Sequence, residues 1–177
     1  MMSLLVSNLI WIQWIVVILL LVGSALISGA EVAFFSLQLK AVEELDENNT
    51  DPRLQRVIAL LKRPKRLLAT ILVANNFINI AIVLVFSVLS HSFLSGIENP
   101  IVVLIIEIGI ITSIILIFGE ILPKVYANRN ALHFSKRMAL LISFLDRYIL
   151  FWITYPMSQT TSFLEKRLGD QKNQFSV

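Results

Sequence analysis

The side chains of this sequence that could bind an ion are oxygen donors set within long apolar runs. Ser24 and Ser28 are four residues apart and so share one face of a helix, and Asn75 and Asn79 repeat that spacing in a later run. Glu120 stands at the end of a third run. Hydroxyl, amide and carboxylate oxygens suit Mg²⁺, Na⁺ or Ca²⁺, whereas the lack of cysteine, and of histidine within these runs, disfavours Zn²⁺ and Cu⁺.

These side chains are expected at similar depths in a membrane. Counted at about 1.5 Å per residue from the charged ends of the runs, the serines lie roughly 10–16 Å deep, the asparagines roughly 12–18 Å and Glu120 about 6 Å. They can therefore surround one point in one half of the bilayer. A single carboxylate among neutral oxygens is a modest charge for a divalent ion, which would bind weakly enough to leave again, as transport requires.

Each of these polar residues also has a structural interpretation. Ser and Asn side chains hydrogen-bond neighbouring membrane helices without binding any ion. Glu31 fits an interfacial position, and Glu107 fits three roles: a protonated carboxyl sheltered from lipid, a second cation site, or part of an outer vestibule. The acidic run at 43–47 is interpreted as a solvated helix face.

The apolar runs that hold these residues are long enough to cross a membrane. With 56% hydrophobic and 15% charged residues, the 177-residue chain has more apolar surface than one soluble core of that size can bury. About 20 apolar residues span the hydrocarbon of a bilayer. The sequence therefore predicts an all-α membrane protein with three transmembrane helices, at about 9–35, 67–89 and 101–120.

All 15 Lys and Arg residues fall in two blocks, one between the first and second spans and one after the third. By the positive-inside rule both blocks are cytoplasmic, which puts the N-terminus and the hairpin at 91–100 outside and the C-terminus inside. These basic residues flank membrane spans and have no interleaved stacking aromatics, so they indicate a lipid bilayer and no nucleic-acid partner.

Three further helices are expected on the cytoplasmic side. Two are short, at 38–47 and at 51–61, and the second begins with an Asp-Pro pair typical of a helix start. The third, a juxtamembrane helix at about 131–156, is apolar enough to be a fourth crossing. Asp146 and Arg147 at its midpoint argue against that crossing, because a charge there costs about 2.5–3.5 kcal/mol.

Three segments of the sequence together resemble a known family. The transmembrane domain of the CNNM/CorC proteins has similar motifs in the same order, here SALISGAEVA from Ser24, LVANNFINI from Leu72 and GEILPK from Gly119. The resemblance implies a homodimer in a bacterial inner membrane that binds Mg²⁺ between its helices without the water shell and exports it, with Na⁺ as the coupling ion. It implies these ligands: the side chains of Ser24, Ser28, Asn75, Asn79 and Glu120, and the backbone carbonyls of Ala74 and Gly119.

Two features depart from that family. Relatives often carry Gly at the position of Ala74, a change that preserves a carbonyl ligand but bears on how closely the helices approach. Family members also continue into a cytoplasmic pair of CBS modules. We expect residues 1–165 to be the transmembrane domain and residues 166–177 to be a linker toward regulatory CBS domains in the full-length chain.

The function predicted from these residues is that of a Mg²⁺ transporter membrane domain. The alternative is a membrane scaffold or sensor of the gliding-motility type, in which the cation is structural and nothing is transported. An enzyme is the least supported class, because the sequence has no nucleophile and base set, no Gly-rich phosphate loop and no HExxH motif.

Overall fold

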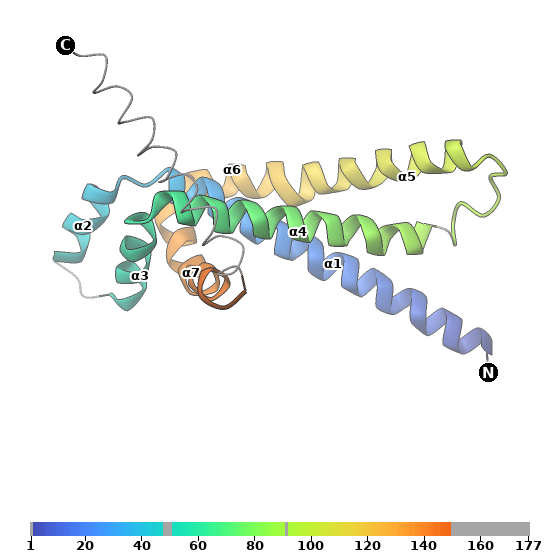
Figure 1. The fold of residues 1–177 in the computed structure, drawn as a ribbon, viewed down its shortest axis with the longest axis horizontal. Coiled ribbons are helices and arrows are strands. Elements are labelled where there is room, and N and C mark those ends of the chain that lie inside the picture. Colours follow the sequence, from blue (N-terminus) through green and yellow to red (C-terminus); the bar gives the residue numbers. More distant parts are fainter. Residues whose placement is uncertain (1, 48–50, 91, 150–177) are drawn as a thin grey trace, which may run out of the picture.

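The computed structural model describes residues 2–47, 51–90 and 92–149, and these are helical apart from short connections. Figure 1 shows three long helices running along one axis, with the shorter helices gathered at one end. The long helices are α1 (Met2–Phe35), α4 (Pro64–Ser90) and α5 (Pro100–Ile114), which continues through the π-helical η1 (Ile115–Ile121) into α6 (Leu122–Arg129). The shorter helices are α2 (Leu39–Glu47), α3 (Pro52–Leu61), α7 (Ala131–Phe144) and the π-helical η2 (Leu145–Ile149).

The three long helices have the length and composition of membrane spans. The candidate spans cover 26, 27 and 30 residues, which at about 1.5 Å per residue reach beyond a hydrocarbon core of about 30 Å. Large apolar side chains lie exposed on their outer faces, among them Trp11, Ile80 and Leu104. Lipid explains that exposure, because a soluble fold rarely leaves so wide an apolar surface uncovered. The predicted all-α membrane protein with three spanning helices is confirmed.

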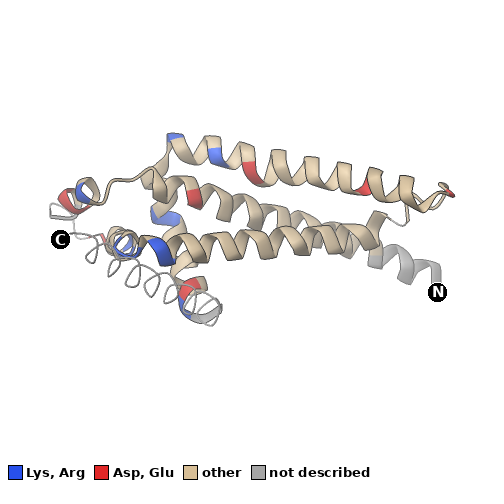
Figure 2. Ribbon diagram, turned by 45° about the horizontal axis from the view of Figure 1, so that its top comes forward, with Lys and Arg blue, Asp and Glu red and all other residues tan. Residues whose placement is uncertain are grey.

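Charged residues distinguish the two ends of the bundle. Figure 2 shows Lys and Arg gathered at the end where the short helices lie. Helix α1 contains no Lys or Arg. The chain from Leu67 to Pro123, which holds most of the two other spans, contains none either. We call this end, where α1 ends and α4 begins, the basic end.

The start of α3 agrees with the signal in its sequence. The carboxylate of Asp51 accepts a hydrogen bond from the backbone N–H of Arg53 at 2.9 Å, and Pro52 occupies the first turn. Lys136 of α7 forms an ion pair with Asp51 at 3.2 Å. The hydrogen bond from the Arg53 amide lowers the pKa of Asp51 below its ordinary value, and the hydrogen bond from Lys136 lowers it further. The cap of α3 therefore also joins it to α7.

The predicted juxtamembrane helix is present as α7 followed by η2. It packs against α3 and α1 at the basic end, and it is not one of the candidate spans among the described residues. Its predicted last part, 150–156, and the predicted linker at 166–177 lie outside the described residues.

Helix α1 approaches α7 closely at Gly29. A Cβ at this position would lie 2.7 Å from Cζ of Phe134, so any larger residue would force that ring to move. The surrounding apolar side chains, including Ile27 and Met138, form a hydrophobic cluster at the basic end. Ala74 belongs to this cluster and is 6% exposed, so alanine is accommodated there.

The third span differs from the prediction at its basic end. The sequence predicts an end near residue 120, whereas the helix continues through η1 and α6 to Arg129. The N–H of Leu122 donates to the carbonyl of Ile117, five residues back, which is the π pattern. This wider turn precedes Pro123, which has no N–H to continue the α pattern, and it lets the helix pass the proline without ending.

Candidate metal site

Three of the predicted ligands, one from each span, form a hydrogen-bonded chain. The hydroxyl of Ser24 in α1 donates to Oδ1 of Asn79 in α4 at 2.7 Å. Nδ2 of Asn79 donates to Oε1 of Glu120 in η1 at 3.1 Å. Asn75, one turn nearer to the basic end, has its Oδ1 3.5 Å from the same serine hydroxyl. Residues far apart in the sequence therefore meet between α1, α4 and η1.

Ser28 adds a second hydroxyl on the same face of α1. Ser24 and Ser28 are both 0% exposed. Oγ of Ser28 is buried and has no hydrogen-bond partner in the described part of the chain. Because an unpaired buried hydroxyl costs about 1–3 kcal/mol, this oxygen gains from any ligand that reaches it.

The two predicted backbone ligands have different surroundings. A Cβ at Gly119 would lie 3.0 Å from Oγ of Ser24, so glycine lets η1 approach α1 at the site. Pro123 has no N–H, so the Gly119 carbonyl lacks the donor that an α-helix supplies four residues later. Ala74 lies within the uninterrupted α4, where its carbonyl accepts the regular helical hydrogen bond. The two carbonyls therefore differ in one respect: the α-helical donor is missing beyond Gly119 and present beyond Ala74.

These groups offer a cation neutral oxygens and one negative charge. Asn75, Asn79 and Glu120 are half-buried, while the serines beside them are fully buried. Among the described residues no group of three or more His, Cys, Asp and Glu gathers to hold a metal. Oxygens of these kinds would suit a hard cation and, with one carboxylate among them, would bind it with modest affinity. That the seven predicted residues are ligands stays a prediction.

A charged pair lies next to these residues on the side of the basic end. Nζ of Lys124 in α6 lies 3.0 Å from Oε2 of Glu31 in α1. The interfacial position considered for Glu31 agrees with this partner. Glu107 lies half-buried in the part of the third span nearer to the opposite end, and it makes no hydrogen bond or ion pair within the described residues.

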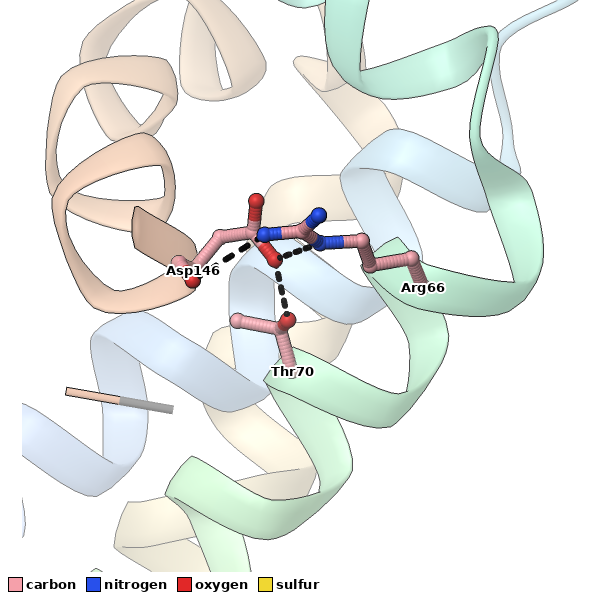
Figure 3. A network of polar contacts seen from close by, with 3 residues as sticks. All are labelled: Arg66, Thr70 and Asp146. Carbon is pink, nitrogen blue, oxygen red and sulfur yellow. Dashed lines mark hydrogen bonds and ion pairs between the residues drawn. The ribbon is translucent and has the colours of Figure 1, made fainter. Parts of the chain in front are cut away.

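A separate polar network, drawn in Figure 3, joins α4 to η2. Nε of Arg66 lies 2.6 Å from Oδ1 of Asp146, and the hydroxyl of Thr70 donates to the same oxygen at 3.0 Å. Nη2 of Arg66 donates to the backbone carbonyl of Asp146 at 3.3 Å. The fully buried Thr70 therefore faces the juxtamembrane helix, although it is only a turn and a half before Asn75 on α4.

The partner of Asp146 is not predicted from the sequence, although a signal for it exists. A carboxylate in the middle of an apolar segment needs a partner, since an isolated charge there is strongly disfavoured. Arg66 directly precedes the second apolar run and is therefore the basic residue nearest to the hydrocarbon on that span. Pairing the carboxylate with that arginine would have placed η2 beside α4.

The chain is similar to a protein family and to several curated proteins. The family profile described as "Cyclin M transmembrane N-terminal domain" matches residues 14–176. A UPF0053 protein of Synechocystis sp. is 32% identical over 129 residues, which are 73% of this chain and 36% of that protein. A UPF0053 protein of Haemophilus influenzae is 30% identical over 158 residues, 88% of this chain and 34% of that protein. The "Metal transporter cnnm-4" of Caenorhabditis elegans is 29% identical over 139 residues, 76% of this chain and 28% of that protein, so the chain spans about a third of these relatives.

Proposed function

This chain belongs to the CNNM family of cyclin M transmembrane domains, and on that basis we propose that it is the membrane domain of a Mg²⁺ transporter. One relative carries the name of a metal transporter, which supports the class of cargo. The proposed cargo is a Mg²⁺ ion held between α1, α4 and η1 without its water shell, and the proposed process is export coupled to Na⁺ entry. The protein then acts as a carrier and not as an enzyme.

The observation that carries this proposal is the meeting of Ser24, Asn79 and Glu120 from three different spans. Ionisable groups inside a span are expensive, and they most often line the path of a substrate or ion. The unpartnered hydroxyl of Ser28 adds a further oxygen of the type that Mg²⁺ prefers.

The proposed orientation puts the basic end in the cytoplasm and the N-terminus outside, in a bacterial inner membrane. The positive-inside rule supports this orientation, because the basic residues gather at one end of the bundle. Cytoplasmic CBS domains of the full-length protein would then follow α7 and η2 and regulate the site from that side.

Asn79→Ala is expected to weaken Mg²⁺ binding, because it removes the amide that lies between Ser24 and Glu120. The wild-type protein should gain about 2.7 kcal/mol of stability when Mg²⁺ is at 100 times its dissociation constant. The variant should gain much less at the same concentration, and its Mg²⁺ flux in proteoliposomes should fall. Thermal unfolding over a Mg²⁺ series and flux on the same preparation measure both effects.

Ser87→Ala is the matched control for that experiment. Ser87 is on the same helix but lies exposed, and its side chain makes no hydrogen bond within the described residues. Its variant should keep the wild-type Mg²⁺ response. An equal response in the wild type and both variants would contradict the proposed site. Mg²⁺-dependent stability without any flux would favour the alternative, a membrane scaffold or sensor with a structural cation.

The proposed homodimer uses the exposed face of α4 around Asn76, whose amide makes no hydrogen bond within the described residues. Phe77 and Ile80 beside it are 73% and 60% exposed. An amide left unsatisfied in hydrocarbon costs several kcal/mol, and a hydrogen bond between membrane helices contributes about 1 kcal/mol. A second copy of the chain would cover this face and supply a partner for the amide.

Asn76→Cys is expected to form a disulfide-linked dimer when membranes are oxidised, since the chain has no other cysteine. Non-reducing electrophoresis measures the fraction that is linked. Leu19→Cys, on the exposed face of α1, is the control and should stay monomeric. A monomeric Asn76→Cys variant, or equal linking of both variants, would contradict a dimer through this face of α4.

A further inference from the structure

Glu31 and Lys124 lie between the proposed cation site and the basic end of the bundle. Glu31 is three residues after Ser28 and shares its face of α1. Lys124 is four residues after Glu120, on α6, and α6 packs along α1. Each partner is therefore about one helical turn, or about 5 Å, from a site residue of its own helix.

An ion pair joins the two side chains across this interval. Nζ of Lys124 lies 3.0 Å from Oε2 of Glu31, and the two side chains are 35% and 30% exposed. In the part of the chain that the structure describes, no other ion pair joins α1 to the third span. Along α1, the pair therefore lies between the proposed cation site and the basic end.

We propose that Glu31 and Lys124 form the gate of the cation site toward the basic end, a role that rests on the cation-binding function proposed above. The ammonium of Lys124 is a tethered cation that occupies the carboxylate of Glu31. A divalent ion that reaches or leaves Glu120 by this route must displace that ammonium. Once displaced, the ammonium leaves Glu31 as a second carboxylate for the passing ion.

The exposure and charge of the pair suit a gate better than a structural tie. A partly exposed ion pair contributes little net stability, so it can open without unfolding its surroundings. The helices are held instead by fully buried apolar contacts, such as those of Ala30 and Ala33 in α1. The positive charge of Lys124, one turn from Glu120, also opposes the approach of another cation while the pair is closed.

The test measures access to a thiol at the site, for which a chain without cysteine is well suited. In Ser28→Cys, methanethiosulfonate reagents that do not cross membranes are applied to oriented vesicles from the side of the basic end. One reagent carries a cationic ammonium and the other an anionic sulfonate. Adding Lys124→Gln or Glu31→Gln should raise both modification rates about fivefold, the equivalent of about 1 kcal/mol for a partly exposed ion pair.

Three further variants separate the gate from a change of local charge. Lys124→Arg should keep the slow rate, and the exchanged pair Glu31→Lys with Lys124→Glu should restore it. Lys136→Gln breaks the ion pair with Asp51 at the same end and should leave the rate unchanged. The proposed gate is contradicted if Lys124→Gln raises the modification rate of the cationic reagent and lowers that of the anionic one. It is also contradicted if neither rate changes.

These rates are measured without Mg²⁺, so the test of the gate is independent of the test of the cation site. Faster modification together with an unaltered Mg²⁺ response in Asn79→Ala would contradict the cation site alone. A lost Mg²⁺ response together with unchanged modification would overturn the gate alone. Ser24→Cys, on the same face of α1, supplies a second thiol position if Ser28→Cys does not fold.

Discussion

Glu120→Gln is expected to remove nearly all Mg²⁺ binding. Glutamine keeps the size of the side chain and can keep a hydrogen bond with Asn79, so the change is chiefly one of charge. The affinity should fall at least about 100-fold, because two opposite unit charges 4 Å apart attract by about 4 kcal/mol at an effective dielectric constant of about 20. Isothermal titration with Mg²⁺ measures the loss directly, and Mg²⁺ flux should disappear with it.

Glu107→Gln is the matched control, since Glu107 is another carboxylate of the third span and lies on α5, away from η1. It should bind Mg²⁺ with the affinity of the wild type. Wild-type affinity in Glu120→Gln would show that this carboxylate is not a ligand. A loss in both variants would instead favour a second cation site or an outer vestibule at Glu107, two of the roles considered for it above.

Asp146→Ala is expected to lower the free energy of unfolding by about 3 kcal/mol, the usual cost of removing one partner from a largely buried ion pair. The carboxylate accepts hydrogen bonds from Arg66 and Thr70, and the paired side chains of Arg66 and Asp146 are 22% and 18% exposed. The change should appear in thermal or denaturant unfolding without Mg²⁺, because the network is separate from the cation site.

A surface ion pair at the same end supplies the control for Asp146. Glu43 and Lys62 lie 3.1 Å apart with side chains 39% and 58% exposed. Glu43→Ala should therefore cost no more than about 0.5 kcal/mol. A double change of Asp146→Leu with Arg66→Met should recover much of the lost stability, because apolar residues of similar volume often replace a buried pair without loss. If Asp146→Ala costs no more than Glu43→Ala, the network does not hold η2 to α4.

Local chemistry made much of the fold predictable. The three spans follow from the length of apolar runs, because the bilayer imposes that length. The start of α3 follows from Asp51 and Pro52, which satisfy or remove backbone donors at a helix start wherever they occur. The meeting of Ser24, Asn79 and Glu120 follows from their depth in the membrane. All three helices cross the same bilayer with the same rise per residue, so depths counted along them can be compared.

Contacts that depend on how helices rotate against one another were not predictable in this way. The π turn at 115–121 depends on how Pro123 is accommodated, and a proline by itself predicts only a break or kink. Thr70 faces Asp146 because of the rotation of α4, which one residue cannot reveal. The role of Gly119 appears only once Ser24 is known to lie against it.

The hydrogen bonds of Asn79 bear on the return half of the proposed transport cycle. A carrier that opens its site to two sides in turn must change shape without cargo as well as with it. A bare carboxylate in a low-dielectric span would slow that step, yet Asn79 can donate to Glu120 while it accepts from Ser24. An ion that binds then replaces Asn79 as the partner of Glu120, and when the ion leaves, the hydrogen bond from Asn79 to Glu120 forms again. Neither half of the turnover needs to pass through an isolated charge.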